Sequence, residues 1–523
     1  MTLRVSLGAA LRAEAELRAQ ELVEAQAASR LAAADHTLWG AQAEAEASIR
    51  LGWIAHPQEM LELVDDISQL RRQFHEAGVS RFVLCGMGGS SLAPEVMAKW
   101  AGVELHILDS THPDHVAAML QGPLESTAVI VSSKSGTTVE TATARAAFEE
   151  AFRQAEIDPA ERIVIVTDPD SPLHREAESS GYRVFLADPT VGGRFSALTA
   201  FGLVPAGLAG VDTSTIIEDA SSAWQAFRDD QVDNPAVALA AAVSGPGGDI
   251  AALLPSARLP GLGDWVEQLV AESTGKDGRG VLPVVTDAPD TPETQMGSDV
   301  LVVDLDGGEP NGRGVSVEAG LGSSFLLWEY ATALSGVLLG VNPFDQPDVE
   351  SAKSAARGLL DHMPQRPEPA VSGEGYRLWA PGAPDSLEAA WVDLLASWGD
   401  SGYLGVQVYG NRLELGHLGA FRSRLAARRG RPVTLGYGPR FLHSTGQFHK
   451  GGTPDGVFLQ VEVEPQADLP IPGYPYTFGT LIDAQSWGDR GVLIDRGRAI
   501  MTLRVESVDI LDSLLARLLD HAG

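Results

Sequence analysis

The chain has 523 residues, of which 44% are hydrophobic and 21% are charged, so it is long enough for about three or four globular domains. Its formal net charge of −32 argues against nucleic acid or an anionic membrane as a partner. A single cysteine, Cys85, excludes an intrachain disulfide and fits a reducing cytoplasm. No targeting segment is apparent, and the best apolar run, AVALAAAV (236–243), is too short to span a bilayer. We therefore expect a soluble, cytoplasmic protein.

The first part of the chain predicts a helical segment followed by an α/β unit. Residues 1–50 are rich in Ala, Glu and Arg, which favour helices, and we expect these helices to pack outside the first domain. From about 51 to 210, Val/Ile/Leu runs alternate with helical stretches, which is typical of a doubly wound parallel sheet that binds its ligand at the carboxyl ends of the strands. The predicted strands are RFVLCGM (81–87), ELHILDS (104–110), TAVIVSS (127–133), RIVIVTD (162–168) and RVFLAD (183–188).

Two further α/β units are predicted, over 211–365 and 376–523, with the Pro/Gly-rich stretch 363–375 as a linker. The predicted elements of the second unit are strands at 249–255, 279–285 and 299–305 and a long helix near 323–339. Those of the third unit are strands near 403–409, 432–437 and 456–463 and a closing helix at about 507–521. The pentapeptide MTLRV occurs at 1–5 and again at 501–505, which we take as chance.

Two turns between a strand and a helix favour an anion. GMGGSS (86–91) and SSKSGTT (132–138) both offer free backbone N–H groups at a helix N-terminus, where the helix dipole also favours negative charge. The second turn adds hydroxyl donors and the positive charge of Lys134, so we expect a phosphorylated small molecule. A polar helix cap is the alternative for the second turn. For the first, the alternatives are a packing turn or a dinucleotide fingerprint completed by Asp109.

Two charged residues are candidates for chemistry. In PTVGGRFS (189–196), Arg194 follows paired glycines and can stabilise developing negative charge, although a surface arginine is the alternative. In the helix DWVEQLVAESTGK (264–276), Glu272 leans toward the apolar face near the C-terminal end. Burial and the negative end of a helix dipole both make a carboxylate bind a proton more tightly. A carboxylate that is a stronger proton acceptor suits the role of general base. A solvent-facing glutamate in a fraying last turn is the alternative.

A loop near the C-terminus, GYGPRFLHSTGQFHKGG (436–452), holds several polar side chains that suit catalysis or binding. They are His443, Gln447, His449 and Lys450. A structural loop is the alternative, but so many functional side chains in one loop favour a functional role. The histidines of the chain do not cluster as a metal site.

In chain order, GMGGSS, SSKSGTTVET, VGGRFS and AESTGK resemble the motifs of the phosphoglucose isomerase family, and GVNPFDQPDVESAK (340–353) resembles its N-x-F-D-Q-x-x-V-E segment. The resemblance covers about residues 50–360. It implies a sugar-isomerase (SIS) fold, with two α/β/α sandwich subdomains of doubly wound parallel sheets followed by a C-terminal α/β unit. The loop 436–452 and PIPGYPYTFGTL (470–481) resemble the isomerase half of fused transaldolase–phosphoglucose isomerase proteins, although only about fifty residues precede the first isomerase strand, too few for a transaldolase barrel.

The resemblance implies interconversion of glucose 6-phosphate and fructose 6-phosphate through a cis-enediol, in glycolysis and gluconeogenesis, with neither metal nor nicotinamide. Glu272 would move the proton between C1 and C2, and Arg194 would stabilise the intermediate. The expected substrate-binding residues are Gly88, Gly89, Ser90, Ser133, Lys134, Ser135, Thr138 and Gln447.

The ring-opening histidine departs from the family pattern. The family carries it in a G-Q-H motif soon after the glutamate motif, yet residues 277–322 contain no histidine. His443 or His449 is therefore expected to take its role, and Lys450 that of the family's C-terminal lysine. Because this histidine often comes from a neighbouring subunit in the family, a homodimer is expected. The alternatives are a non-catalytic sugar-phosphate regulator of the same fold, an oxidoreductase that binds a nucleotide at Gly86 and Asp109, and additional mannose 6-phosphate activity.

Overall fold

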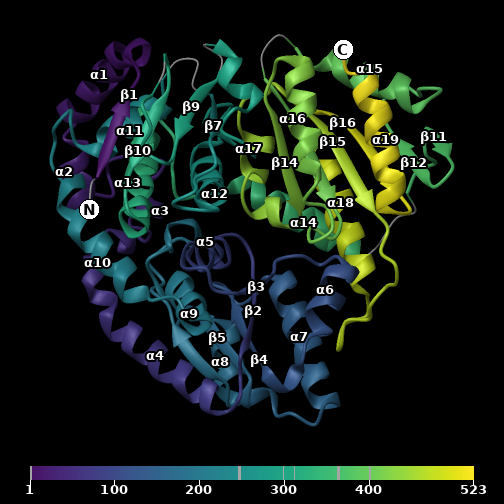
Figure 1. Cartoon of the computed structure of the whole chain (residues 1–523), viewed down its shortest axis with the longest axis horizontal. Coiled ribbons are helices and arrows are strands. Elements are labelled where there is room, and N and C mark those ends of the chain that lie inside the picture. The colour runs from purple at the N-terminus through teal and green to yellow at the C-terminus, as the bar shows by residue number, and fades with distance from the viewer. Residues whose placement is uncertain (1–2, 246–248, 298–299, 311, 362–365, 400–401) are drawn as a thin grey trace.

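Three β-sheets organise the chain, and Figure 1 shows each in a lobe of its own. The computed structural model describes residues 3–245, 249–297, 300–310, 312–361, 366–399 and 402–523. The first sheet has the strand order β3-β2-β4-β5-β6, the second β1-β10-β9-β7-β8 and the third β11-β12-β16-β15-β13-β14. In Figure 1 the first sheet lies at the bottom, the second at the upper left and the third at the upper right.

The first sheet is parallel throughout, and all five predicted strands are confirmed. Its strands are β2 (Arg81–Gly86), β3 (His106–Leu108), β4 (Thr127–Ser132), β5 (Ile163–Thr167) and β6 (Arg183–Leu186). Its helices are α4 (Leu61–Glu76), α5 (Leu92–Ala101), α6 (Pro113–Leu120), α7 (Val139–Gln154), α8 (Pro172–Ser179) and α9 (Ala200–Ala209). The chain moves from β2 to β3 on one side and then to β4 on the other, so the carboxyl ends of β2 and β4 flank the point where the strand order reverses. A parallel sheet of this kind binds its ligand in that crevice.

The second sheet contains the three predicted strands and two that the sequence did not predict. The predicted strands are β7 (Ile250–Leu253), β8 (Leu282–Val285) and β9 (Leu301–Asp304). The additional strands are β10 (Val315–Glu318) and β1 (Arg4–Leu7), which pair antiparallel. Helices are present in residues 1–50 as predicted, but Arg4–Leu7 form β1, a strand that the sequence did not predict and that completes the edge of the second sheet. The helices of residues 1–50 are α1 (Ala9–Glu24), α2 (Ala27–Ala32) and α3 (Glu44–Ala47).

One buried helix forms the centre of the second lobe. Every residue from Leu321 to Gly336 of α13 (Leu321–Leu339) is buried, which confirms the long helix predicted near 323–339. A helix that is apolar on all sides packs inside a domain rather than on its surface. The helices packed against it include α10 (Thr213–Ala223), α11 (Pro235–Val243) and α12 (Leu262–Thr274). The helix α14 (Pro347–Asp361) follows in the chain and packs against the C-terminal lobe instead.

The third sheet also contains the three predicted strands together with others. The predicted strands are β13 (Tyr403–Tyr409), β14 (Val433–Gly438) and β15 (Gly456–Val463), and the additional strands are β11 (Val371–Gly373), β12 (Tyr376–Trp379) and β16 (Ala499–Val505). Its helices are α15 (Leu387–Ser397), α16 (Leu418–Arg429), α17 (Gly446–Gly451), α18 (Phe478–Asp495) and α19 (Val508–Asp520). The predicted linker 363–375 is wrong at its C-terminal end, because β11 pairs with β12 as a hairpin, while residues 363–365 lie outside the described residues.

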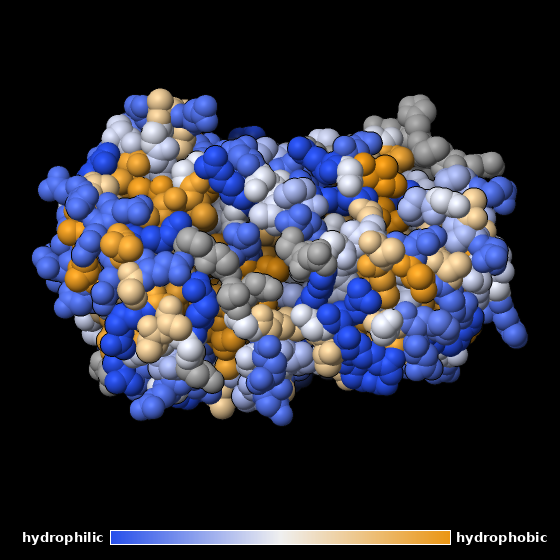
Figure 2. All heavy atoms as spheres, turned by 90° about the horizontal axis from the view of Figure 1, so that it is seen from above, coloured by the Kyte–Doolittle hydropathy of each residue, from blue (hydrophilic) through white to orange (hydrophobic). Residues whose placement is uncertain are grey.

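The hydrophobic core is divided in the same way as the sheets. The largest cluster of buried side chains joins the N-terminal helices, one face of the first sheet and the helices around α13, whereas a separate cluster fills the C-terminal lobe. Cys85 is buried in the first sheet. Figure 2 shows that hydrophilic residues cover most of the face seen there. In the part of the chain that the structure describes, no helix is long and apolar enough to cross a membrane.

Candidate active site

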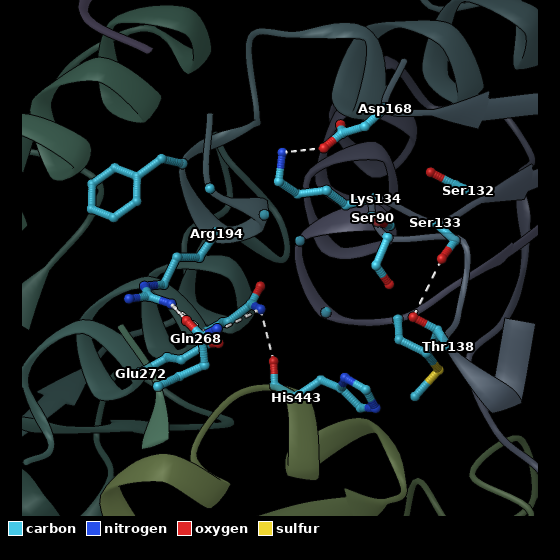
Figure 3. A pocket seen from close by; sticks show the side chains of 18 of the residues that line it. Ser90, Ser132, Ser133, Lys134, Thr138, Asp168, Arg194, Gln268, Glu272 and His443 are labelled. Carbon is cyan, nitrogen blue, oxygen red and sulfur yellow. Dashed lines mark hydrogen bonds and ion pairs between the residues drawn. The ribbon is translucent and has the colours of Figure 1, made fainter. Parts of the chain in front are cut away.

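A cavity of about 420 Å³ opens at the carboxyl ends of β2 and β4, with lining residues from all three lobes (Figure 3). Its size is in the range of small-molecule sites. Most of the residues predicted from the sequence meet here. Those that line the cavity are Gly88, Gly89, Ser90, Ser133, Lys134, Ser135, Thr138, Arg194, Glu272 and His443.

The glycines of the first turn allow three segments of the site to approach one another. A Cβ atom on Gly89 would lie 2.0 Å from the carbonyl oxygen of Gly193, beside Arg194. Gly88 has a φ of +55°, and a Cβ there would lie 2.6 Å from Nε2 of Gln268 and 2.8 Å from the carbonyl oxygen of His443. The turn therefore needs glycine at both positions for close packing and, at Gly88, for the left-handed backbone.

The second turn, residues 132–138, forms one side of the cavity (Figure 3) and is called the phosphate turn below, after the anion that its sequence predicts. It runs from the end of β4 to Thr138, which is the N-cap of α7, so the free N–H groups of the first turn of that helix lie beside it. The Oγ atom of Ser133 donates to Oγ1 of Thr138 at 3.3 Å. Lys134 is half-buried, and its Nζ lies 2.6 Å from the Asp168 carboxylate and 3.1 Å from the carbonyl oxygen of Pro189.

Glu272 lies in the last turn of α12, on the opposite side of the cavity from the phosphate turn (Figure 3). It is only 8% exposed, so the solvent-facing alternative is wrong. Its Oε2 accepts a hydrogen bond from Nε2 of Gln268 at 3.0 Å, and its Oε1 lies 3.2 Å from Nη1 of Arg194. These two contacts hold the carboxylate in one orientation.

Arg194 is buried, and its guanidinium is saturated with acceptors. Besides the ion pair with Glu272, it donates to Oγ of Ser273 at 2.8 Å and to Oε1 of Gln346 at 2.8 Å. Its Nη2 donates to the carbonyl oxygens of Pro343 at 2.6 Å and Asp345 at 3.0 Å. Burial lowers the pKa of the Arg194 guanidinium, and the Glu272 carboxylate counteracts this. The surface-arginine alternative is therefore wrong.

Lys276, just after α12, contacts the same segment as Arg194, residues 343–345. Its ammonium donates to the carbonyl oxygen of Asp345 at 2.6 Å and to the carboxylate of that residue at 2.7 Å. Burial and the nearby Arg194 charge lower the pKa of Lys276 to about 8. Two buried cations thus converge on residues 343–345.

His443 comes from the C-terminal lobe, at the end of the short 3-10 helix η10 (Arg440–His443). Its Nε2 lies 3.1 Å from the Glu140 carboxylate of α7, and its carbonyl oxygen accepts a hydrogen bond from Nε2 of Gln268 at 2.7 Å. A carboxylate acceptor at Nε2 favours the tautomer that carries its proton there. Arg194, Glu272 and His443 are called the acid–base cluster below.

Three residues of the C-terminal loop do not line the cavity. His449 is buried beside Phe441 and Phe458, and its Nδ1 lies 2.8 Å from the hydroxyl of Tyr403. Burial lowers the pKa of His449 well below its usual value. Of the two histidines left open by the sequence, only His443 reaches the cavity.

Lys450 and Gln447 have structural partners instead. Nζ of Lys450 forms a buried ion pair with Asp489 at 2.6 Å. Nε2 of Gln447 donates to the carbonyl oxygen of Gly275 at 3.0 Å and to the Asp348 carboxylate at 2.8 Å. The expected catalytic role of Lys450 and substrate contact of Gln447 are therefore corrected: Lys450 neutralises a buried carboxylate, and Gln447 ties the end of α12 to the start of α14.

Several lining residues were missed by the sequence analysis. Three of them, Ser132, Thr141 and Gln268, are buried, and each has a side-chain oxygen with no hydrogen-bond partner among the described residues. A buried polar group without a hydrogen bond costs free energy. These three side chains therefore indicate a polar ligand that forms hydrogen bonds with them. The other missed polar lining residues are Arg50, Asp168 and Gln346.

Asp109, the acid of the dinucleotide alternative, does not face the cavity. It is fully buried, and its carboxylate is bound by the guanidinium groups of Arg412 and Arg440 from the C-terminal lobe, with Nε of Arg412 at 3.0 Å. Its position therefore does not suit a ribose. No group of three His, Cys, Asp or Glu side chains in the described ranges is placed to hold a metal ion.

The parallel sheets and the polar cavity at their carboxyl ends define a sugar isomerase fold, and comparison with solved structures agrees. A hypothetical protein from Thermus thermophilus superposes with a TM-score of 0.59 at 26% identity, over 69% of this chain and 100% of that one. A glucose-6-phosphate isomerase from Chlamydia trachomatis gives a TM-score of 0.52 at 22% identity, over 60% and 75% of the two chains.

Sequence comparison is more specific. The family model for phosphoglucose isomerase matches residues 57–279. A probable glucose-6-phosphate isomerase from Natronomonas pharaonis is 31% identical over 333 residues, which is 53% of this chain and 78% of the relative. One from Halobacterium salinarum is 32% identical over 323 residues, or 51% and 76% of the two chains. The chain belongs to the phosphoglucose isomerase family. The resemblance of its C-terminal unit to fused transaldolase proteins stays a prediction.

Proposed function

We propose that this protein is a glucose-6-phosphate isomerase that interconverts glucose 6-phosphate and fructose 6-phosphate in glycolysis and gluconeogenesis. One observation carries the proposal: a buried Glu272–Arg194 pair lies across a single cavity from the phosphate turn. One end of the cavity offers a base and a positive charge, and the other end offers hydrogen-bond donors for an anion. This arrangement suits a sugar phosphate whose C1 and C2 undergo proton transfer.

The phosphate group binds at the phosphate turn. Ser90, Ser133, Ser135 and Thr138 supply hydroxyl donors, and the first turn of α7 supplies backbone N–H groups. Lys134 supplies a positive charge, which Asp168 holds in place at 2.6 Å. Anchoring the phosphate fixes C1 and C2 near the acid–base cluster, and such positioning lowers the barrier of the proton transfer.

His443 opens the sugar ring. The proton of the C1 hydroxyl leaves, the ring C–O bond breaks, and the ring oxygen takes up a proton, so a single acid–base group can serve both steps. Glu140 holds the Nε2 edge of the imidazole at 3.1 Å, and the other ring nitrogen, Nδ1, is the one we assign to the substrate.

Glu272 then transfers the proton between the two carbons. Its carboxylate removes the C2 proton of the open-chain aldose, the C–H electrons form a C1–C2 double bond, and the carbonyl oxygen at C1 takes the negative charge. Return of the proton to C1 and movement of the O2 proton to O1 give the ketose. All the N–H groups of Arg194 have acceptors in the protein, so the intermediate feels its charge across the cavity or replaces Glu272 at Nη1.

The decisive experiment measures isomerisation of both sugar phosphates with no added metal, in D₂O. Turnover with deuterium entering C2 of glucose 6-phosphate supports the proposal, because a shuttled proton exchanges with solvent. Binding of both sugars without turnover would identify a non-catalytic regulator instead. Mannose 6-phosphate in the same assay tests the wider specificity.

The chemistry is assigned to one chain. His443 reaches the cavity from the C-terminal lobe of the same chain, so the proposed reaction needs no residue from a second subunit. The expected homodimer therefore rests on the family resemblance alone. Sedimentation of the purified protein measures it.

A further inference from the structure

A second cavity, of about 320 Å³, lies behind the substrate cavity. The segment 187–200 separates the two: Gly192, Gly193 and Arg194 face the substrate cavity, whereas Leu198 and Ala200 face the second one. Phe195 lines both. The remaining walls come from residues 52–63, around the short helices η1 (Gly52–Ile54) and η2 (Pro57–Met60), and from α13.

The lining of the second cavity is mainly apolar, with side chains such as Trp53, Leu63, Leu198 and Leu326. Leu186, which also lines the cavity, is 49% exposed. An apolar cavity of about 150 Å³ is enough to hold benzene, so this one has room for a substituted ring.

Two residues of this lining each carry a polar atom that has no hydrogen-bond partner in the part of the chain that the structure describes. Glu329 of α13 is 1% exposed, and its Oε1 has no hydrogen-bond partner among the described residues. Trp53 is 6% exposed, and its Nε1 is unpartnered in the same sense. Unsatisfied polar groups at such depth cost free energy, and a ligand that satisfies them recovers it.

The protonation of Glu329 indicates which ligand chemistry fits. Burial raises the pKa of Glu329 well above its usual value, and the backbone N–H of Ala197 is the hydrogen-bond donor that acts against this. A neutral carboxyl group and an indole N–H are both donors, so they call for an acceptor on the ligand. Glu59 and Asp188, also in the lining, disfavour an anionic ligand.

We propose that this cavity is a second ligand site, which binds a small neutral molecule with an aromatic or aliphatic body and one carbonyl-type acceptor. Binding there is coupled to the substrate cavity through Phe195.

The physical link is a row of aromatic rings. Trp53 stacks on Phe195 with ring centroids 5.0 Å apart, and Phe195 lies 5.5 Å from Phe344, which lines the substrate cavity. Phe195 also follows Arg194 directly, and that guanidinium lies 5.9 Å from the ring. A ligand that moves Trp53 or Phe195 therefore acts on the acid–base cluster.

The binding test uses fluorine NMR of 4′-fluoroacetophenone with the full-length protein, and 1-ethyl-4-fluorobenzene as the analogue without an acceptor. We expect saturable shift and broadening of the ketone resonance, and about tenfold weaker binding of the hydrocarbon. Equal binding of the two probes, or none of the ketone, would overturn the site. This comparison needs no variant.

Variants locate the site. Leu63→Trp fills the cavity and should abolish ketone binding, whereas Leu17→Trp, at a leucine 65% exposed on α1, should leave it unchanged. Glu329→Leu removes the donor and should weaken binding about tenfold, while Glu329→Gln keeps an N–H donor and should stay within about twofold. Binding that survives Leu63→Trp would place the probe elsewhere and refute the proposal.

The coupling half rests on the proposed function and is measured separately. Calorimetry of fructose 6-phosphate with and without saturating ketone should show about a fivefold change in Kd, and an unchanged Kd would refute the coupling. If fructose 6-phosphate does not bind at all, the proposed function fails, while the NMR experiment still decides the second site.

Discussion

The phosphate turn and the acid–base cluster lie in one cavity but are built in different ways. The phosphate turn is a run of consecutive residues between β4 and α7, and its side chains range from buried Ser133 to exposed Ser135. The acid–base cluster joins three distant segments, at Arg194, Glu272 and His443, which are held by buried contacts to Gln268 and to residues 343–346.

The difference supports the different functions that we propose for the two regions. A local turn at a helix N-terminus binds an anion through its backbone and hydroxyl groups, with little help from the rest of the fold. A buried base beside a guanidinium needs several lobes to exclude water and hold its geometry. We therefore expect changes in the acid–base cluster to reduce kcat and changes in the phosphate turn to raise KM.

The largest expected effect is that of Glu272→Gln. The amide keeps the shape of the side chain but cannot accept the C2 proton, so kcat should fall about 10³-fold with little change in KM. Steady-state kinetics in both directions measures this.

The matched control is Glu267→Gln on the same helix, at a residue that does not line the cavity. Burial raises the pKa of Glu267 well above its usual value, so glutamine imitates its neutral form and kcat should be unchanged. An active Glu272→Gln enzyme would remove Glu272 from the role of base.

The second effect is that of His443→Ala, which should lower turnover of the cyclic sugar phosphate about 10²-fold. His449→Phe, in the aromatic core beside Tyr403, should keep kcat, because that ring does not reach the cavity. Turnover is measured with the cyclic substrate, whose ring must open. Equal losses in the two variants would contradict the assignment of ring opening to His443.

The third effect concerns the phosphate turn. Lys134→Met removes a charge-assisted contact to the phosphate, so KM should rise about 10- to 100-fold while kcat changes far less. Lys99→Met on α5, at a lysine paired with Glu95 and outside the cavity lining, is the control and should leave KM unchanged. A kcat-only defect in Lys134→Met would break the division between the two regions.

The same division explains what could be predicted from the sequence. The five strands of the first sheet are buried apolar runs, and the phosphate turn could be predicted from its local sequence alone. Arg194 and Glu272 were found by local pattern and family resemblance together. The choice between His443 and His449 was not local, because it depends on partners far along the chain: His443 ends η10 and meets Glu140 of α7, whereas His449 lies on α17 against Tyr403 of β13.

The residues that were missed depend on contacts between distant segments. Arg50 reaches the cavity because its guanidinium donates to the carbonyl oxygen of Pro189 at 3.2 Å, and no motif marks it. Gln268 carried a usable signal, since it lies one helical turn before Glu272 and shares its face. Lys450 was misassigned because its neighbour Asp489 lies on α18, far along the chain.

The repeated pentapeptide MTLRV shows the same limit for strands. Arg4 and Val5 begin β1, an edge strand that pairs antiparallel with β10, whereas residues 501–505 end β16, which lies between β12 and β15. The sequence analysis predicted neither β1 nor β16, and the same pentapeptide contributes to an edge strand in one sheet and an interior strand in another. Short strands of this kind are decided by their partners rather than by their own residues.

The smallest expected effect concerns the support of the acid–base cluster by α13. The Glu329 side chain accepts the backbone N–H of Ala197, three residues after Arg194. Burial raises the pKa of Glu329 well above the 4.5 of an unfolded chain, so above about pH 4.5 the folded protein holds a proton that the unfolded chain has lost. This contribution lowers stability as pH rises, by up to about 1.4 kcal/mol per pH unit.

Glu329→Gln removes that dependence, because an amide does not titrate and its oxygen still accepts the Ala197 N–H. The Tm of the variant minus that of the wild type should therefore increase from pH 5 to pH 8, by about 1–2 °C per pH unit. Calorimetric melting across this range measures the difference, with Glu218→Gln on the exposed side of α10 as the control. A difference that stays flat would mean that Glu329 is ionised in the folded protein. The helix α13 would then hold a buried negative charge that does not titrate over this range.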